Sequence, residues 1–118
     1  MSYFGTSGIV ATDLYTAQAT STKAEVTDDP NSEVWGFSIS NGTAALAYLQ
    51  VFDLDADAVT VGSTAPTYAI GVPAGEAICV VFPKQIIHQT GFTIASTTTR
   101  TGSSNAAQEV TIFYTHRA

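Results

Sequence analysis

The stretch Val34-Trp35-Gly36-Phe37-Ser38-Ile39-Ser40 decides the fold class of this chain. Its large apolar residues, Trp35, Phe37 and Ile39, occupy every second position, and small residues lie between them. Successive side chains of an extended strand point to opposite faces, so this spacing puts all three on one face. We therefore predict a half-buried strand that contributes Trp35, Phe37 and Ile39 to a hydrophobic core.

Turn signals bound this strand on both sides, and similar short segments follow along the chain. Asp28-Asp29-Pro30-Asn31 precedes the strand, and Asn41-Gly42 follows it as a turn in which both residues tolerate a positive φ. A helical start at 44–47 is disfavoured, because the residues that follow prefer a strand. We predict further strands at 22–27, 45–54, 67–72, 76–82, 92–96 and 108–115, with a small extended piece at 59–61.

The run from Glu76 to Phe82 is nearly all apolar, which predicts a central strand covered on both faces. Cys79 lies within this run, and we expect it to be a small buried apolar residue. Trp35 is likewise expected in the core, and not on a ligand-binding surface.

Seven or eight short strands with a turn every ~8–12 residues are typical of an antiparallel β-sandwich. The sequence leaves open whether the sandwich is a jelly roll or immunoglobulin-like. A chain of 118 residues fits one domain. We predict an all-β sandwich domain over 21–118, preceded by an extended N-terminal arm over 1–20 with one short strand at 9–17.

Charged residues make up 12% of the chain, about half the usual share, and hydroxyl side chains take their place as 18 Thr and 10 Ser. The net charge of −6 would repel a phosphate backbone, so nucleic acid is not an expected partner. Anionic membrane surfaces are disfavoured for the same reason. Neither a signal peptide nor a membrane span is visible, so we expect a soluble product made in the cytoplasm.

Few residues offer chemistry. Asp53-Leu54-Asp55-Ala56-Asp57 imitates the start of an EF-hand, but Ala58 and Thr64 stand where that loop needs glycine and glutamate. We interpret it as a solvated loop. The histidines, His88 and His116, have no metal-ligand spacing, and His88 is expected in a loop or an interface. We therefore predict no catalytic, cofactor or metal site, and a protein that is not an enzyme.

Several segments together resemble a group of small β-sandwich proteins encoded among the structural genes of tailed bacteriophages. They are Leu49-Gln50-Val51-Phe52-Asp53-Leu54, Val59-Thr60-Val61-Gly62-Ser63-Thr64-Ala65-Pro66, Val72-Pro73-Ala74-Gly75-Glu76, Thr90-Gly91-Phe92-Thr93-Ile94-Ala95 and the closing Val110-Thr111-Ile112-Phe113-Tyr114. The resemblance covers roughly 34–115, carries no catalytic motif and transfers no functional residue.

The resemblance implies a structural protein of the virion. The first expectation is a capsid decoration (cement) protein that binds the outside of the phage head as a homotrimer and stabilises it, with the major capsid protein as partner. The alternative is a head-fibre, tail-spike or receptor-binding module that recognises a host ligand through the loops 55–66 and 97–107, with Tyr48 and Tyr68 as aromatic candidates. A small hydrolase acting on the cell envelope is the third and weakest reading.

The expected contacts with the capsid or with other copies lie in the arm and in one loop. Tyr3, Phe4, Ile9 and Val10 are apolar residues of the arm that need a surface to cover. Arg100 lies in the Thr-rich loop, and arginine is enriched at interfaces because it binds carboxylates with two hydrogen bonds.

Overall fold

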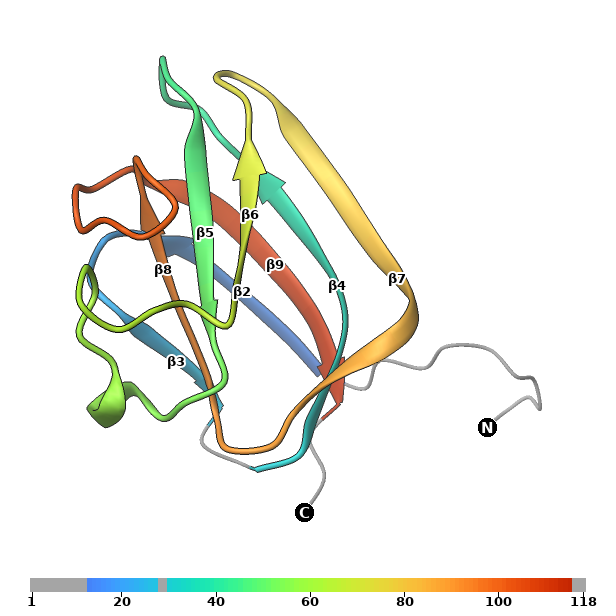
Figure 1. The fold of residues 1–118 in the computed structure, drawn as a ribbon. Helices are drawn as coiled ribbons and strands as arrows, with labels where there is room; N and C mark the ends of the chain where they lie inside the picture. The colour runs from blue at the N-terminus through green and yellow to red at the C-terminus, as the bar shows by residue number, and fades with distance from the viewer. Residues whose placement is uncertain (1–12, 28–29, 116–118) are drawn as a thin grey trace.

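The computed structural model describes residues 13–27 and 30–115, which form two antiparallel sheets packed face to face (Figure 1). The predicted all-β sandwich is therefore confirmed. The elements are β2 (Asp13–Ala19), β3 (Ala24–Thr27), β4 (Ser32–Ser40), β5 (Ala47–Phe52), the 3-10 helix η1 (Ala56–Ala58), β6 (Tyr68–Val72), β7 (Ala77–His88), β8 (Phe92–Thr97) and β9 (Gln108–Thr115). No helix in this described part is long and apolar enough to cross a membrane.

The strand order identifies the sandwich as a jelly roll. One sheet has the order β2-β9-β4-β7, and the other has the order β3-β8-β5-β6. The antiparallel pairs β5/β6, β4/β7, β3/β8 and β2/β9 are nested along the chain, as in a long hairpin that starts at β5 and β6. When this hairpin rolls up, β9 pairs with β4 and β8 pairs with β5, which completes the two four-stranded sheets.

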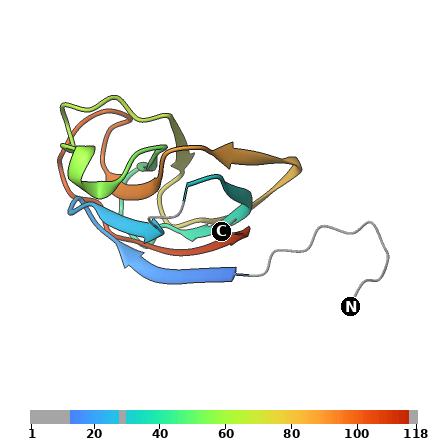
Figure 2. The same cartoon turned by 90° about the horizontal axis from the view of Figure 1, so that it is seen from below.

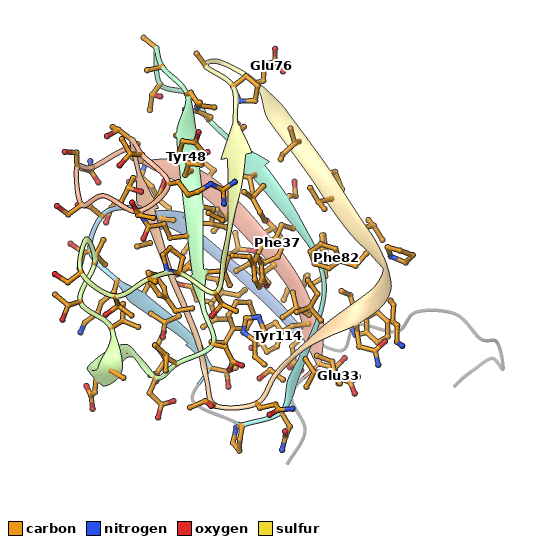
Figure 3. All side chains as sticks on the ribbon, viewed as in Figure 1. Glu33, Phe37, Tyr48, Glu76, Phe82 and Tyr114 are labelled. Atoms are coloured by element: carbon orange, nitrogen blue, oxygen red, sulfur yellow. The ribbon has the colours of Figure 1, made fainter. Side chains whose placement is uncertain are left out.

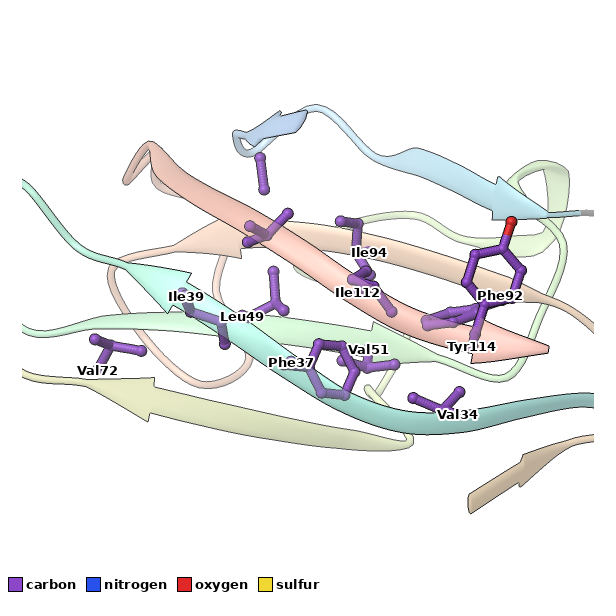
Figure 4. Close-up of a cluster of buried hydrophobic side chains, with 12 residues drawn as sticks. Val34, Phe37, Ile39, Leu49, Val51, Val72, Phe92, Ile94, Ile112 and Tyr114 are labelled. Atoms are coloured by element: carbon purple, nitrogen blue, oxygen red, sulfur yellow. The ribbon is translucent and has the colours of Figure 1, made fainter. Parts of the chain in front are cut away.

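The core lies between the sheets and is built from the inward side chains of both (Figure 4). Phe37 is fully buried at its centre and meets the rings of Tyr68, Phe82 and Phe92 edge to face, with centroids 6.0–6.5 Å apart. Phe37 and Tyr114, labelled in Figure 3, belong to this core, and Phe82 packs against it. The predicted burial of Phe37 and Ile39 is confirmed.

The predicted burial of Trp35 is wrong, because β4 carries a bulge at this residue. Val34 pairs with Tyr114 and Gly36 with Phe113, so two steps along β4 match one step along β9. The extra residue, Trp35, leaves the inward alternation and becomes partly exposed. Its indole N–H donates to the Oγ1 of Thr115 at 3.2 Å, on the outer side of the sheet.

β7 also differs from its prediction as a central strand covered on both faces. It lies at the edge of its sheet among the described strands, and its residues alternate between partly buried and exposed. Cys79 is exposed, not buried. The outward residues of the run are apolar like its inward ones, but no described part of the chain covers them. The strand also continues to His88 through a bulge over 82–85, where pairing with β4 is interrupted.

The arm predicted over 1–20 contributes a strand to the sandwich. β2 (Asp13–Ala19) pairs with β9 over its whole length without a register shift, and Ala19 belongs to the core. The strand predicted over 9–17 is therefore observed in an overlapping position, and its described part covers 13–19. The sandwich includes residues that the predicted boundary at 20 would leave outside it.

The turn at Asn41-Gly42 is held by a side chain instead of a positive φ. Neither residue has a positive φ, which occurs at Asn31, Gly62 and Gly75 among the described residues. Asn41 is buried, and its amide nitrogen Nδ2 donates to the carbonyl oxygens of neighbouring segments, including Val72 at 2.9 Å. The asparagine therefore links the end of β4 to the end of β6.

Candidate functional site

The outward side of the sheet β2-β9-β4-β7 presents a regular grid of side chains, which we call the open face. Strand pairing fixes its rows. The first row is Leu14, Phe113, Gly36 and Val81; the second is Thr16, Thr111, Ser38 and Cys79; the third is Gln18, Glu109, Ser40 and Ala77. Each row runs across the strands in the order β2, β9, β4, β7.

The open face is apolar at one end and nearly free of charge. Leu14 is 66% exposed and Val81 62% exposed, so no part of the described chain covers either end of the first row. Glu109 is the one charged residue among the twelve grid positions, and it accepts a hydrogen bond from Gln18 at 3.1 Å. The open face is therefore about as poor in charge as the whole chain, and exposed apolar side chains lie at both ends of its first row, as on surfaces that bind other proteins.

The bulge in β4 shapes this face. At Gly36 a side chain would overlap the carbonyl oxygen of Val80, because β7 approaches the bulge closely. Only glycine fits there, and it lies buried in the first row between Phe113 and Val81. The same bulge turns Trp35 outward beyond this row, toward Thr115.

The outward side of the other sheet is covered by two loops, over 53–67 and 97–107 (Figure 2). The first loop packs Val59 against Phe52, so the extended piece predicted at 59–61 is a buried loop contact and not a strand. The second loop is fixed by Gln50. Its amide nitrogen Nε2 donates to the hydroxyl of Thr97 and to the carbonyl oxygens of Thr99 and Gly102. This sheet therefore has no open face of its own.

A shallow depression lies where these two loops meet. Its volume is about 160 Å³, and its lining comprises Ala65, Pro66, Thr67, Tyr68, Ala69, Arg100 and Thr101. The guanidinium carbon of Arg100 lies 5.8 Å from the ring centroid of Tyr48, within range of a cation–π contact. Arg100 is exposed, so its charge is available to an anionic group.

A polar cluster that shares Tyr68 with this depression organises the turn between β7 and β8. Asp53 accepts hydrogen bonds from the backbone N–H groups of Gln89, Thr90 and Gly91 at 2.8–3.1 Å. His88 is buried, its Nδ1 lies 3.2 Å from the carbonyl oxygen of Gly91, and its Nε2 lies 3.0 Å from the hydroxyl of Tyr68. The carbonyl can only accept, so Nδ1 carries the proton and Tyr68 donates to Nε2.

The ionisation of this cluster follows from its burial. Burial lowers the pKa of His88 below its ordinary value, against the opposing effects of Asp53 and the Gly91 carbonyl. Burial raises the pKa of Tyr68, and the charge of Asp53 adds to this effect. Burial works against ionisation of Asp53, but its three backbone hydrogen bonds and His88 lower its pKa overall. All of these hydrogen bonds join groups within the chain, so the cluster holds the turn between β7 and β8 in place.

Two predictions about these residues change. His88 was expected in a loop or interface, but it is the last residue of β7 and lies in the interior. Asp53 was expected in a solvated loop, but it binds the turn at 89–91. No group of three or more His, Cys, Asp or Glu side chains suited to a metal ion occurs among the described residues.

The predicted contact residues are placed only in part. Arg100 lies at the rim of the depression. Tyr3, Phe4, Ile9 and Val10 lie outside the described residues. The open face was not predicted from the sequence, although one signal was available. Phe113 falls on the opposite face of its strand from Val110 and Ile112, which indicates an apolar residue that points away from the core.

No protein-family model matches the chain, and neither the curated proteins nor the solved structures contain a match to it.

Proposed function

We propose that this chain is a non-enzymatic structural protein of a virus particle, and specifically a capsid decoration protein that binds the outside of a phage head and stabilises it. The major capsid protein is its proposed partner, with residues 1–12 and Arg100 as proposed contacts. The observation that carries the proposal is the open face, an unpartnered sheet surface with exposed apolar side chains at both ends of its first row, which suits contact with other protein subunits. A surface of this kind serves binding.

Two further observations support a virion protein. The jelly-roll order of the strands recurs in viral capsid domains and in lectins, although a fold alone does not determine a function. The resemblance of 34–115 to structural proteins of tailed phages points in the same direction. The polar cluster around His88 has its hydrogen bonds directed at its own turn, which favours a structural role over a catalytic one.

The depression beside Arg100 favours a second candidate, a fibre, tail-spike or receptor-binding module. A guanidinium held near Tyr48 at the rim of a hollow of about 160 Å³ is suited to a small ligand with a carboxylate group. In that case a host surface ligand would be the partner, and the loops over 53–67 and 97–107 would bind it.

Cryo-electron microscopy of phage particles whose genome encodes this chain separates these proposals. Density for the sandwich at hundreds of positions on the outer head surface is the expected result. A few to a few dozen copies on fibres or the tail would support the second candidate. Absence of the chain from purified particles, measured by mass spectrometry, would contradict both. Undiminished head binding after deletion of residues 1–12 would refute the arm as the contact.

A further inference from the structure

We propose that the open face binds the open face of a second copy of this chain, so that two jelly rolls pair about a twofold axis that runs along the strands. This inference rests on the proposed function in treating the open face as a binding surface. It goes further by naming the occupant of that surface and the register in which it binds.

The two halves of the open face differ in bulk in a complementary way. The half formed by β2 and β9 carries the larger side chains, which are Leu14, Phe113, Thr16, Thr111, Gln18 and Glu109. The half formed by β4 and β7 carries the smaller ones, which are Gly36, Val81, Ser38, Cys79, Ser40 and Ala77. Within the twelve grid positions, the face is therefore higher over β2 and β9 than over β4 and β7.

A twofold axis along the strands sets the high half of one copy on the low half of the other. Each row then faces the same row of the partner in reverse order. Leu14 faces Val81, and Phe113 faces Gly36, which has no side chain. The axis is compatible with the angle of roughly 30° at which packed sheets usually cross.

The remaining rows also match in this register. Thr16 faces Cys79 and Thr111 faces Ser38, so small polar groups meet small polar groups. In the third row the long side chains of Gln18 and Glu109 face the short Ala77 and Ser40. Glu109 therefore avoids its own symmetry mate, which would be repelled.

Charge favours this face over the rest of the surface for self-association. Copies of net charge −6 repel each other in general, and the twelve positions of the open face hold one of the ten carboxylate side chains of the chain. The open face therefore offers a contact with little repulsion. Addition of strands to the edge of β7 is disfavoured, because its bulge over 82–85 contains Pro83 and Lys84.

The size of the face predicts a weak and reversible pair. From strand spacing and rise, the grid with its margins measures about 20 by 25 Å, or about 500 Å² per copy. Two copies would bury about 1,000 Å² in total, near the lower limit for a specific interface. Salt should strengthen the pair, because it screens the repulsion between acidic copies and leaves the apolar contact intact.

Charge exchange at the first row tests the register. Leu14→Lys and Val81→Glu each put a charge into an apolar contact, and each change enters a twofold interface twice. We expect either single variant to weaken association at least about tenfold. The double variant should recover most of it, because each lysine then faces a glutamate of the partner. Within one chain the two positions are three strands apart, so the rescue requires the second copy.

The measurement is sedimentation equilibrium of the full-length chain from micromolar to millimolar concentration. Leu46→Glu is the matched control, because Leu46 is 45% exposed but lies outside the open face, and it should leave association unchanged. Far-ultraviolet circular dichroism verifies that each variant is folded. A second reading uses Thr16→Cys with a short bismaleimide, which should link the introduced thiol to Cys79 of the other copy, whereas the wild-type chain should stay uncrosslinked.

Several results would overturn the inference. They are a wild-type chain that stays monomeric throughout, single variants with the affinity of the wild type, or a double variant no better than the single ones. A homotrimer, the state predicted from the sequence, would also contradict a twofold pair. A monomer found on phage heads would refute the pair alone, and a pair absent from particles would refute the proposed function alone.

Discussion

Replacing Asn41 with alanine removes the side chain that joins the ends of β4 and β6. Its Nδ2 donates to the carbonyl oxygens of Ala45, Val72 and Pro73 at 2.9–3.2 Å. Its Oδ1 accepts from the backbone N–H and the hydroxyl of Thr43 at 2.9 and 2.7 Å. The residue is 1% exposed, so water cannot replace these partners without opening the turn.

The expected loss can be worked out bond by bond. The Thr43 hydroxyl can donate to the Ala45 carbonyl, and the Pro73 carbonyl also accepts from the N–H of Glu76, so these groups keep a partner. The bonds to the Val72 carbonyl and from the Thr43 N–H then go unreplaced, at about 1 kcal/mol each, which predicts a loss of about 2 kcal/mol in the free energy of unfolding.

Urea denaturation followed by circular dichroism measures this loss. The matched control is Asn105→Ala, because Asn105 is exposed and its side-chain oxygen accepts one bond, from the N–H of Ser21. We expect the control to cost about 1 kcal/mol or less. If Asn41→Ala is no more destabilising than Asn105→Ala, the explanation of this turn by the asparagine side chain is wrong.

Three further predictions concern the bulge, the buried histidine and the exposed thiol. Gly36→Ala should lower the free energy of unfolding, measured by urea denaturation, by about 1–3 kcal/mol, because the added methyl group overlaps the Val80 carbonyl. The control Gly42→Ala has open space around the added methyl group and should lower the free energy of unfolding by less. The pKa of His88 is lowered in the folded chain, so the unfolded chain binds more protons as the pH falls. Stability should therefore fall as the pH drops below about 6.5. A melting temperature that stays constant from pH 7.5 to 5.5 would contradict this. Cys79 should react with Ellman's reagent in the folded monomer without prior unfolding, and a reaction limited by unfolding would refute its exposure.

Much of the fold follows from local patterns in the sequence. Alternation predicted the strand that contains Phe37 and Ile39, and both residues are in the core. The choice between jelly roll and immunoglobulin-like sandwich needed the strand order, which depends on contacts far apart in the chain. Trp35 was misplaced because a bulge shifts the alternation by one residue, and the bulge is visible only in the pairing of β4 with its neighbours.

The candidate site was harder to predict than the fold. An apolar residue on the outer face of a sheet looks the same in sequence as one in the core, so Val81 and Cys79 were assigned to a covered strand. Only the pairing of four strands shows that Leu14, Phe113, Gly36 and Val81 share a row. The two loops that cover the other sheet likewise distinguish the open face from the closed one.

The sequence holds one tryptophan, Trp35, and it lies on the side of the sandwich that we propose as the contact surface. Acrylamide quenching of its fluorescence, measured as the protein concentration is raised, therefore tests the central claim most directly. We predict strong quenching in dilute protein that declines as copies pair, and no decline in the Val81→Glu variant. Weak quenching at every concentration would show that Trp35 is buried in the core. Strong quenching that does not decline as the concentration rises would contradict the pairing of two copies through the open face.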